Sequence, residues 1–144
     1  MIGGGCLNRI GDGGGSGSTV SNYGFIGGGR NNFIRGDMDY AVIGGGYENI
    51  VTGPMGVILG GHANSITTGL CAAIVSGSAN HGDSDFGFIG NGNSNDINTG
   101  EGATIVNGAE NTATGAYSFI GNGALFNQVG VPLPNNTTSG PYSF

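Results

Sequence analysis

Basic residues are scarce in this chain of 144 residues. Only three are present, Arg9, Arg30 and Arg35, against nine acidic residues, and the formal net charge is −6. Proteins that bind nucleic acid neutralise its phosphates with clusters of lysine and arginine. Three arginines in an acidic chain do not supply such a surface. The composition therefore argues against nucleic-acid binding.

Long apolar segments are missing as well. No run approaches the roughly 18 consecutive apolar residues that span a bilayer. The sequence starts with Met1 followed by Ile2 and three glycines, without the basic region and apolar stretch of a signal peptide. From these features we expect no membrane insertion, and assembly in the cytoplasm of the producing cell.

Cysteine occurs only twice, as Cys6 and Cys71. In the repeat described below these residues fall four coils apart, roughly 19 Å at about 4.8 Å per coil. The Cα atoms of a disulfide lie within about 7 Å of each other. We therefore predict two unpaired thiols, buried and reduced.

Glycine, in contrast, makes up 34 of the 144 residues, and it is not randomly placed. Eight isoleucines are each followed three residues later by a glycine, and seven of these glycines are followed after three more residues by an asparagine. The isoleucines are Ile2, Ile26, Ile43, Ile58, Ile74, Ile89, Ile105 and Ile120. The eighth asparagine is displaced by one residue, to Asn127. Self-similarity at such spacing is typical of a solenoid.

The repeat length indicates the fold. From Ile43 onward the repeats are 15, 16, 15, 16 and 15 residues long. Glycine at this density costs a helix about 1 kcal/mol per residue relative to alanine, so we expect two short strands and tight turns in each repeat. We predict an all-β protein, a parallel β-solenoid of about eight coils of 15–16 residues. Residues 1–24 form the first coil and a Gly/Ser-rich capping insertion, residues 25–129 the repeats, and residues 130–144 an extended tail.

The glycine and asparagine columns have a structural interpretation. A glycine is expected where the backbone adopts a positive φ or passes close to the next coil. Asparagine tolerates the left-handed conformation, and its amide can bond to neighbouring turns. We expect coil five, with Asn80, His81 and Gly82, to depart from the Asn-x-Ile pattern of the other coils.

The residue before each core isoleucine is mostly apolar. Successive side chains of a strand point to opposite faces, so this second column faces outward, and a strand that is apolar on both faces is expected to be buried on both. Other copies of the chain are the natural cover. The predicted trimer interface consists of Phe25, Val42, Val57, Phe88 and Phe119.

The unit Ala41-Val42-Ile43-Gly44-Gly45-Gly46, with Asn49 and Gly53, resembles the repeats of YadA-like heads. This family comprises left-handed β-rolls that associate as trimers in trimeric autotransporter adhesins and in fibre proteins of phages and large viruses. The resemblance covers residues 24–129 and implies a left-handed, trimeric roll, although the residues themselves leave the handedness open. The coils are longer than the usual 14 residues, and from the sequence we expect no signal peptide, coiled-coil stalk or membrane anchor.

Candidates for chemistry are few. His81 is followed by Asp83 and Asp85, the best metal-like cluster in the sequence, and His62 follows the glycine of coil four. We interpret the first group as a solvated turn, and His62 has no second ligand at the spacing of a metal site. The sequence therefore predicts no catalytic residue, no cofactor and no metal site.

Two further features belong to the edges of the predicted roll. Four threonines lie near one edge of successive coils, at Thr52, Thr67, Thr99 and Thr114, a partial likeness to ice-binding solenoids. The tail ends in Pro141-Tyr142-Ser143-Phe144, and we expect Tyr142 and Phe144 to dock on the same or an adjacent protomer.

Together these features predict a non-enzymatic, trimeric component of a virus particle, such as a fibre, spike or capsid decoration protein of a phage. Its partners are then other copies of itself, other structural proteins of the particle, and a host receptor or glycan. A bacterial surface adhesin or an extracellular filament subunit is the alternative, with an extracellular or cell-surface location. An ice-binding solenoid is the third.

Overall fold

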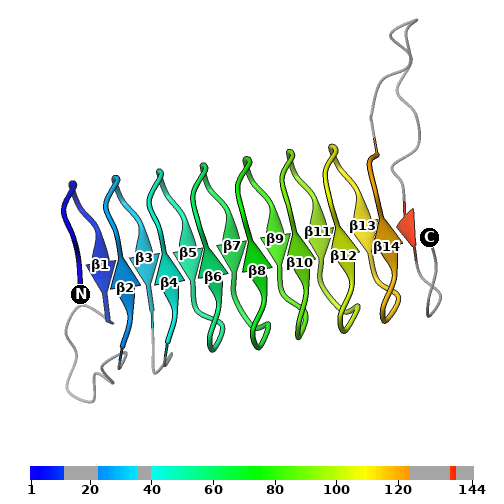
Figure 1. The fold of residues 1–144 in the computed structure, drawn as a ribbon, viewed down its shortest axis with the longest axis horizontal. Coiled ribbons are helices and arrows are strands. Elements are labelled where there is room, and N and C mark those ends of the chain that lie inside the picture. The colour runs from blue at the N-terminus through cyan, green and yellow to red at the C-terminus, as the bar shows by residue number, and fades with distance from the viewer. Residues whose placement is uncertain (12–22, 36–39, 124–136, 139–144) are drawn as a thin grey trace, which may run out of the picture.

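The computed structural model describes residues 1–11, 23–35, 40–123 and 137–138. Within these ranges the regular elements are strands of two residues, each paired in parallel with strands one coil away. The chain winds into a β-solenoid (Figure 1), which confirms the predicted fold class. In the same ranges no helix is long and apolar enough to cross a membrane.

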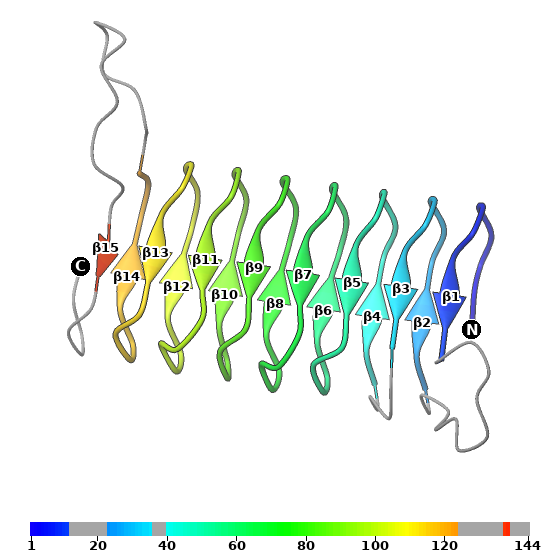
Figure 2. The ribbon, with the colours of Figure 1, turned by 180° about the vertical axis from the view of Figure 1, so that it is seen from behind.

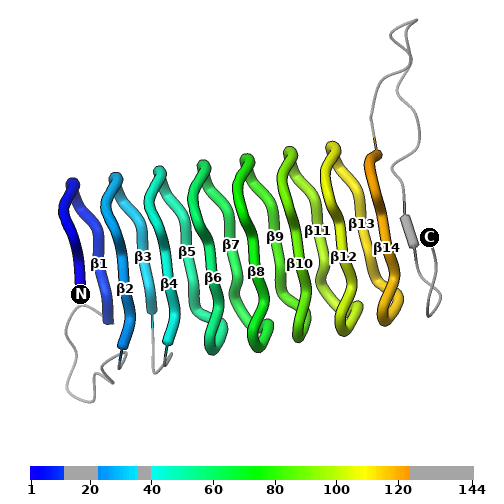
Figure 3. Tube along the Cα trace, viewed as in Figure 1, coloured from blue at the N-terminus to red at the C-terminus, as the bar shows by residue number. Residues whose placement is uncertain are grey.

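Each coil contributes one strand to each of two sheets. The eight-stranded sheet consists of β1 (Arg9–Ile10), β3 (Phe33–Ile34), β5 (Ile50–Val51), β7 (Ser65–Ile66), β9 (His81–Gly82), β11 (Asp96–Ile97), β13 (Thr112–Ala113) and β15 (Thr137–Thr138). The seven-stranded sheet consists of β2 (Phe25–Ile26), β4 (Val42–Ile43), β6 (Val57–Ile58), β8 (Ala73–Ile74), β10 (Phe88–Ile89), β12 (Thr104–Ile105) and β14 (Phe119–Ile120). The coils lie side by side along one axis (Figure 3), with β1 at one end and β14 and β15 at the other (Figure 2).

The core is a thin apolar layer between the two sheets. From β2 to β14 the second residue of each strand lies on the inner face, and the core isoleucines of the seven-stranded sheet, from Ile26 in β2 to Ile120 in β14, are at most 1% exposed. Fully burying such a side chain contributes about 1.5–3 kcal/mol, so the stack of coils buries what no single coil can. In the seven-stranded sheet the residue before each strand is small, and Ala41, Ala72 and Ala103 at this position are fully buried.

Coil five keeps the ladder despite its sequence. His81 and Gly82 form β9, which pairs with β7 and β11, and Gly82 takes the core position that isoleucine or valine takes in neighbouring coils. Coil five departs from the Asn-x-Ile pattern in sequence, as predicted, but its backbone keeps the strand pairing of the other coils. A Cβ at Gly82 lies 3.5 Å from Ile74 Cγ1, an ordinary contact distance.

The asparagines form a buried ladder. From Asn8 to Asn95 each side-chain amide donates to a carbonyl of its own coil, four residues earlier, and to the glycine carbonyl of the next coil. For Asn49 these bonds go to Gly45 and Gly61, both at 3.0 Å. The Oδ1 of Asn32 accepts from both the backbone N and the Nδ2 of Asn49, at 3.0 and 3.1 Å. The predicted amide bonds between turns are thus present.

The left-handed conformation, however, falls on the residue before each asparagine. Leu7, Asn31, Glu48, Ala63 and Ala79 have φ between 54° and 58°. The prediction that the asparagine column itself adopts it is wrong, because each asparagine directly precedes a strand, where its amide can reach the adjacent coils.

The glycine column is required for both predicted reasons. Gly77 has φ +97°, and a Cβ there lies 2.2 Å from the carbonyl oxygen of Gly92. Any side chain at this position meets the backbone of the next coil.

The last strand comes from the part of the sequence predicted as the tail. Thr112 and Ala113 of β13 pair in parallel with Thr137 and Thr138 of β15. The displaced Asn127 lies outside the described residues.

Candidate binding surfaces

The outer face of the seven-stranded sheet is largely apolar. The first residue of each strand projects outward, and this column runs Phe25, Val42, Val57, Ala73, Phe88, Thr104 and Phe119. Phe88 is 38% exposed and Phe119 41% exposed, while Phe25, Val42 and Val57 are half-buried. All five residues of the predicted interface therefore lie in one line on one face.

A second apolar column runs beside this face. It lies three residues before each core isoleucine and holds Tyr23, Tyr40, Met55, Phe86 and Tyr117, which are 43–74% exposed. All five have φ between 53° and 63°, which is unusual for bulky residues. The rings of Tyr23 and Tyr40 stack at 5.0 Å with an interplanar angle of 8°. The sequence analysis missed this column, although its constant offset from the isoleucines was a signal.

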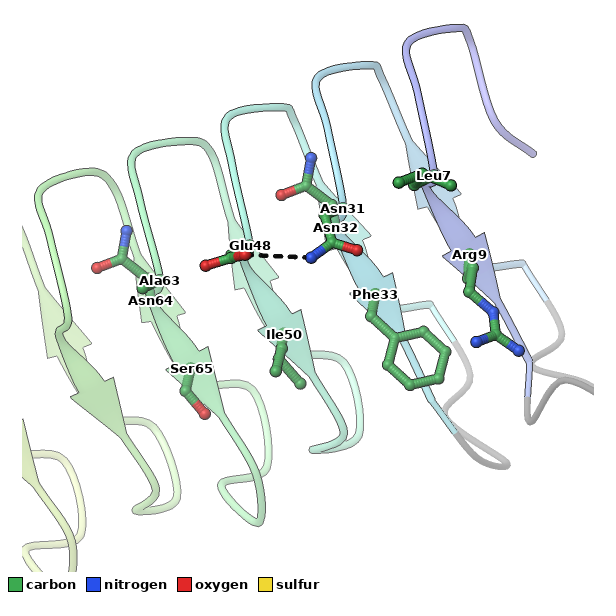
Figure 4. A pocket seen from close by; sticks show the side chains of 10 residues that line it. All are labelled: Leu7, Arg9, Asn31, Asn32, Phe33, Glu48, Ile50, Ala63, Asn64 and Ser65. Carbon is green, nitrogen blue, oxygen red and sulfur yellow. Dashed lines mark hydrogen bonds between the residues drawn. The ribbon is translucent and has the colours of Figure 1, made fainter.

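The outer face of the eight-stranded sheet carries a shallow hollow of about 410 Å³ over its first strands (Figure 4). Phe33 and Ile50 line it with Leu7 and Arg9, and Glu48 accepts a 3.3 Å hydrogen bond from Asn31 at its side.

Arginines surround Phe33 on this face. The Arg9 Cζ lies 5.4 Å and the Arg35 Cζ 5.9 Å from the centre of the Phe33 ring. Arg30 lies 5.7 Å from the ring of Tyr47. Among the described residues, none of these three arginines forms a salt bridge with a carboxylate. The sequence analysis missed this cluster, although Arg9 and Phe33 occupy equivalent positions in consecutive coils.

Of the predicted group of His81, Asp83 and Asp85, only the first two are in contact. His81 Nε2 lies 3.0 Å from Asp83 Oδ2, and His81 Nδ1 lies 3.2 Å from Asp96 Oδ1. Asp83 also accepts hydrogen bonds from the Thr67 backbone and hydroxyl. Asp85 lies elsewhere and accepts a 2.9 Å bond from the backbone of Leu70. The predicted neighbour Asp85 is thus replaced by Asp96, which follows His81 by one coil.

His62 lies apart from this group. Its ring stacks on Tyr47 at 5.2 Å, and its Nε2 lies 3.9 Å from Glu48 Oε2. The side-chain hydrogen bond between Tyr47 and Glu48 is the main reason that the pKa of Glu48 is lowered and that the pKa of Tyr47 is raised. In the described ranges, no three His, Cys, Asp or Glu side chains are placed to hold a metal ion.

Threonines predicted along one edge of the coils form hydrogen bonds to the next coil. The hydroxyl of Thr52 donates to the Thr67 carbonyl at 2.9 Å, and that of Thr99 to the Thr114 carbonyl at 3.3 Å. Asp83 takes the corresponding place in coil five, where it accepts the Thr67 hydroxyl bond. These hydroxyl groups therefore connect coils to one another.

Both cysteines are free and exposed. The absence of a bond between Cys6 and Cys71 agrees with their predicted separation, but the prediction that they are buried is wrong. Cys71 lies three residues before Ile74, the same offset as Met55 and Phe86 from their isoleucines, and shares their positive φ, at 55°. Tyr142 and Phe144, the predicted docking residues of the tail, lie outside the described residues.

Comparison with known proteins places this chain in no family. No family model matches it, and neither the curated proteins nor the solved structures contain a significant match.

Proposed function

We propose that this chain is a rigid, homotrimeric β-roll that serves as a non-enzymatic structural or receptor-engaging part of a virus particle, such as a phage fibre, spike or capsid decoration protein. The observation that carries the proposal is the apolar column on the outer face of the seven-stranded sheet. Phe88 and Phe119 expose large rings there, in line with Val42 and Val57.

Stiffness is the second support for the proposal. Backbone bonds connect each coil to the next in both sheets, and the ladder asparagines from Asn8 to Asn111 add side-chain bonds between successive coils. A solenoid of this kind transmits load along its axis through many parallel bonds. The assignment to a virus particle rests on the resemblance to fibre repeats, and its expected partners are other proteins of that particle and a host receptor or glycan.

The mass of the full chain in solution tests the trimer. We expect light scattering in about 500 mM salt, where surface charges are screened, to report three chains at all concentrations. Phe88→Asp places a charge within the apolar column and is expected to yield single chains with an unchanged circular dichroism spectrum. Thr112→Asp adds the same charge at an outward position of the other sheet and serves as the matched control.

A single-chain mass for the unaltered protein contradicts the trimer. A mass that grows with concentration favours the alternative, a bacterial surface adhesin or an extracellular filament subunit. The feature that favours this alternative is the end of the stack at β14, an edge strand that is able to template pairing with another chain. Mass spectrometry of purified virus particles and of cell-surface fractions from the source separates the two locations.

A further inference from the structure

We infer that the outer face of the eight-stranded sheet is a second, separate interface, on which a second copy of this chain docks in antiparallel orientation. The proposal uses the sheet opposite the trimer face, so it does not depend on the trimer. It rests on the placement of charge along two neighbouring columns of side chains.

One end of the face carries an aromatic ring between two cations. Arg9 and Arg35 both lie over the ring of Phe33, so the three side chains share one side of the sheet. The register places Arg9 on β1 and Phe33 on β3, and Arg35 directly follows β3.

The other end carries an imidazole ring between two carboxylates. His81 contacts Asp83 and Asp96 through its two ring nitrogens, so these side chains also share one side of the sheet. His81 lies on β9 and Asp96 on β11, while Asp83 directly follows β9. The acidic cluster thus repeats the arrangement of the basic cluster with the opposite charge.

One two-fold rotation places the basic cluster of each copy opposite the acidic cluster of the other copy. A two-fold axis that lies between two facing copies, parallel to the strands and midway between β5 and β7, exchanges β1 with β11 and β3 with β9. The rotation reverses the stack and keeps each side chain in its own column. Arg9 then faces Asp96, Arg35 faces Asp83, and Phe33 faces His81.

Arg9 and Asp96 lie in one column of side chains, and Arg35 and Asp83 lie in another column two residues further along the strands. The same two-fold axis pairs opposite charges in both columns. The symmetry doubles each charge pair, so four ion pairs surround a centre where Ile50 of one copy faces Ser65 of the other. Glu48 lies near the centre of the face, at the level of β5. Under the two-fold rotation it faces Ala63 of the other copy, so it meets no like charge. Opposite potentials of this kind select both the partner and the register.

Charge reversal tests the docking. We expect the weight-average mass of the full chain to rise at least about twofold when salt is lowered from about 500 to about 20 mM, because screening weakens exposed pairs. Asp96→Arg turns two of the four pairs repulsive, and we expect it to lower the association constant at least about tenfold. Glu110→Arg, the same charge change at the level of β13, faces no strand of the second copy and is the matched control.

The double variant Arg9→Asp with Asp96→Arg exchanges the charges within one chain and is expected to restore the association. Loss of association in Asp96→Arg without rescue in the double variant contradicts the antiparallel register. An unaltered protein whose mass is the same at both salt concentrations contradicts the interface itself.

Crosslinking provides a readout that is independent of the trimer. In a Cys6→Ser, Cys71→Ser background, cysteines at positions 9 and 96 are expected to be joined between chains by a bismaleimide that reaches about 10 Å, the spacing of packed sheets. The product on a denaturing gel is a covalent dimer. A single cysteine at position 9, in the same background, lies five strands out of register with position 9 of the facing copy, roughly 24 Å along the stack, and serves as the control. Equal dimer yields for the cysteine pair and for the single cysteine contradict the proposal, whatever the outcome for the trimer.

Discussion

The asparagine ladder makes a sharp prediction for Asn80, which is fully buried in the middle of the stack. Its Nδ2 donates to Asn64 Oδ1, to the Ser76 carbonyl and to the Gly92 carbonyl, at 3.1, 3.2 and 3.0 Å. Its Oδ1 accepts from the backbone N and the Nδ2 of Asn95, at 3.0 and 3.1 Å. Substitution by alanine removes all five bonds but keeps the backbone of coil five.

The expected cost follows from the groups that lose their partners. The backbone N–H of Asn95 is left buried without its acceptor, which costs about 1–3 kcal/mol. The other four lost bonds cost about 0.5 kcal/mol each, at the low end of the usual range, because three of them share the two hydrogens of one Nδ2 group. We expect Asn80→Ala to lower the free energy of unfolding by about 3–5 kcal/mol. For a chain of this size that corresponds to a fall in Tm of about 10–15 °C.

Thermal unfolding followed by circular dichroism measures this change. Asn93→Ala is the control, because Asn93 is an exposed asparagine one coil further on, whose Oδ1 accepts a hydrogen bond from the neighbouring Ser94 hydroxyl on the surface. We expect its Tm to stay within about 2 °C of the unaltered protein, as for most surface substitutions. If Asn80→Ala and Asn93→Ala shift the Tm equally, the ladder does not stabilise the stack.

Three further outcomes are expected. Gly77→Ala forces a Cβ to within 2.2 Å of a carbonyl oxygen at a positive φ, and we expect a loss of about 2 kcal/mol or more, measured by urea unfolding. Gly60→Ala, with no atom within 4 Å of the added Cβ, is its control, and equal losses contradict the argument from close approach. Gly82→Ala fills ordinary contact space in the core and is expected to raise stability by about 0.5–1 kcal/mol, whereas a lower Tm shows that the site is already full. Cys6 and Cys71 are exposed, so a thiol reagent is expected to label both in the native protein, and labelling that requires denaturant contradicts their placement.

The core and the outward apolar column were predictable because the repeat is in register. Parallel pairing places equivalent residues of successive coils directly beside one another, so Ile43 lies next to Ile58 and Val42 next to Val57. Residues at equivalent positions of the sequence repeat therefore lie next to one another in the structure. The same logic identifies the pair His81 and Asp96, since each follows a ladder asparagine.

Other features depend on backbone geometry that side-chain type does not reveal. Leu7, Glu48 and Met55 all adopt positive φ, although none of these residue types favours it. The local cost is about 1–2 kcal/mol per residue, and the bonds of the adjacent coils offset it. Residue preference alone therefore assigned the left-handed turn to the asparagines, one position too late.

The sequence by itself determined the periodicity, the parallel stack and the identity of the buried columns, because hydrophobic spacing and glycine placement act locally and repeat in every coil. Only the tertiary structure decided which corner residues carry the positive φ, that Cys71 faces solvent, that β15 comes from the end of the chain, and that the charged clusters occupy opposite ends of one face. These features depend on the path of the backbone through each turn. That path is set by hydrogen bonds between coils, which join residues about 15 positions apart and leave little trace in the sequence around any one of them.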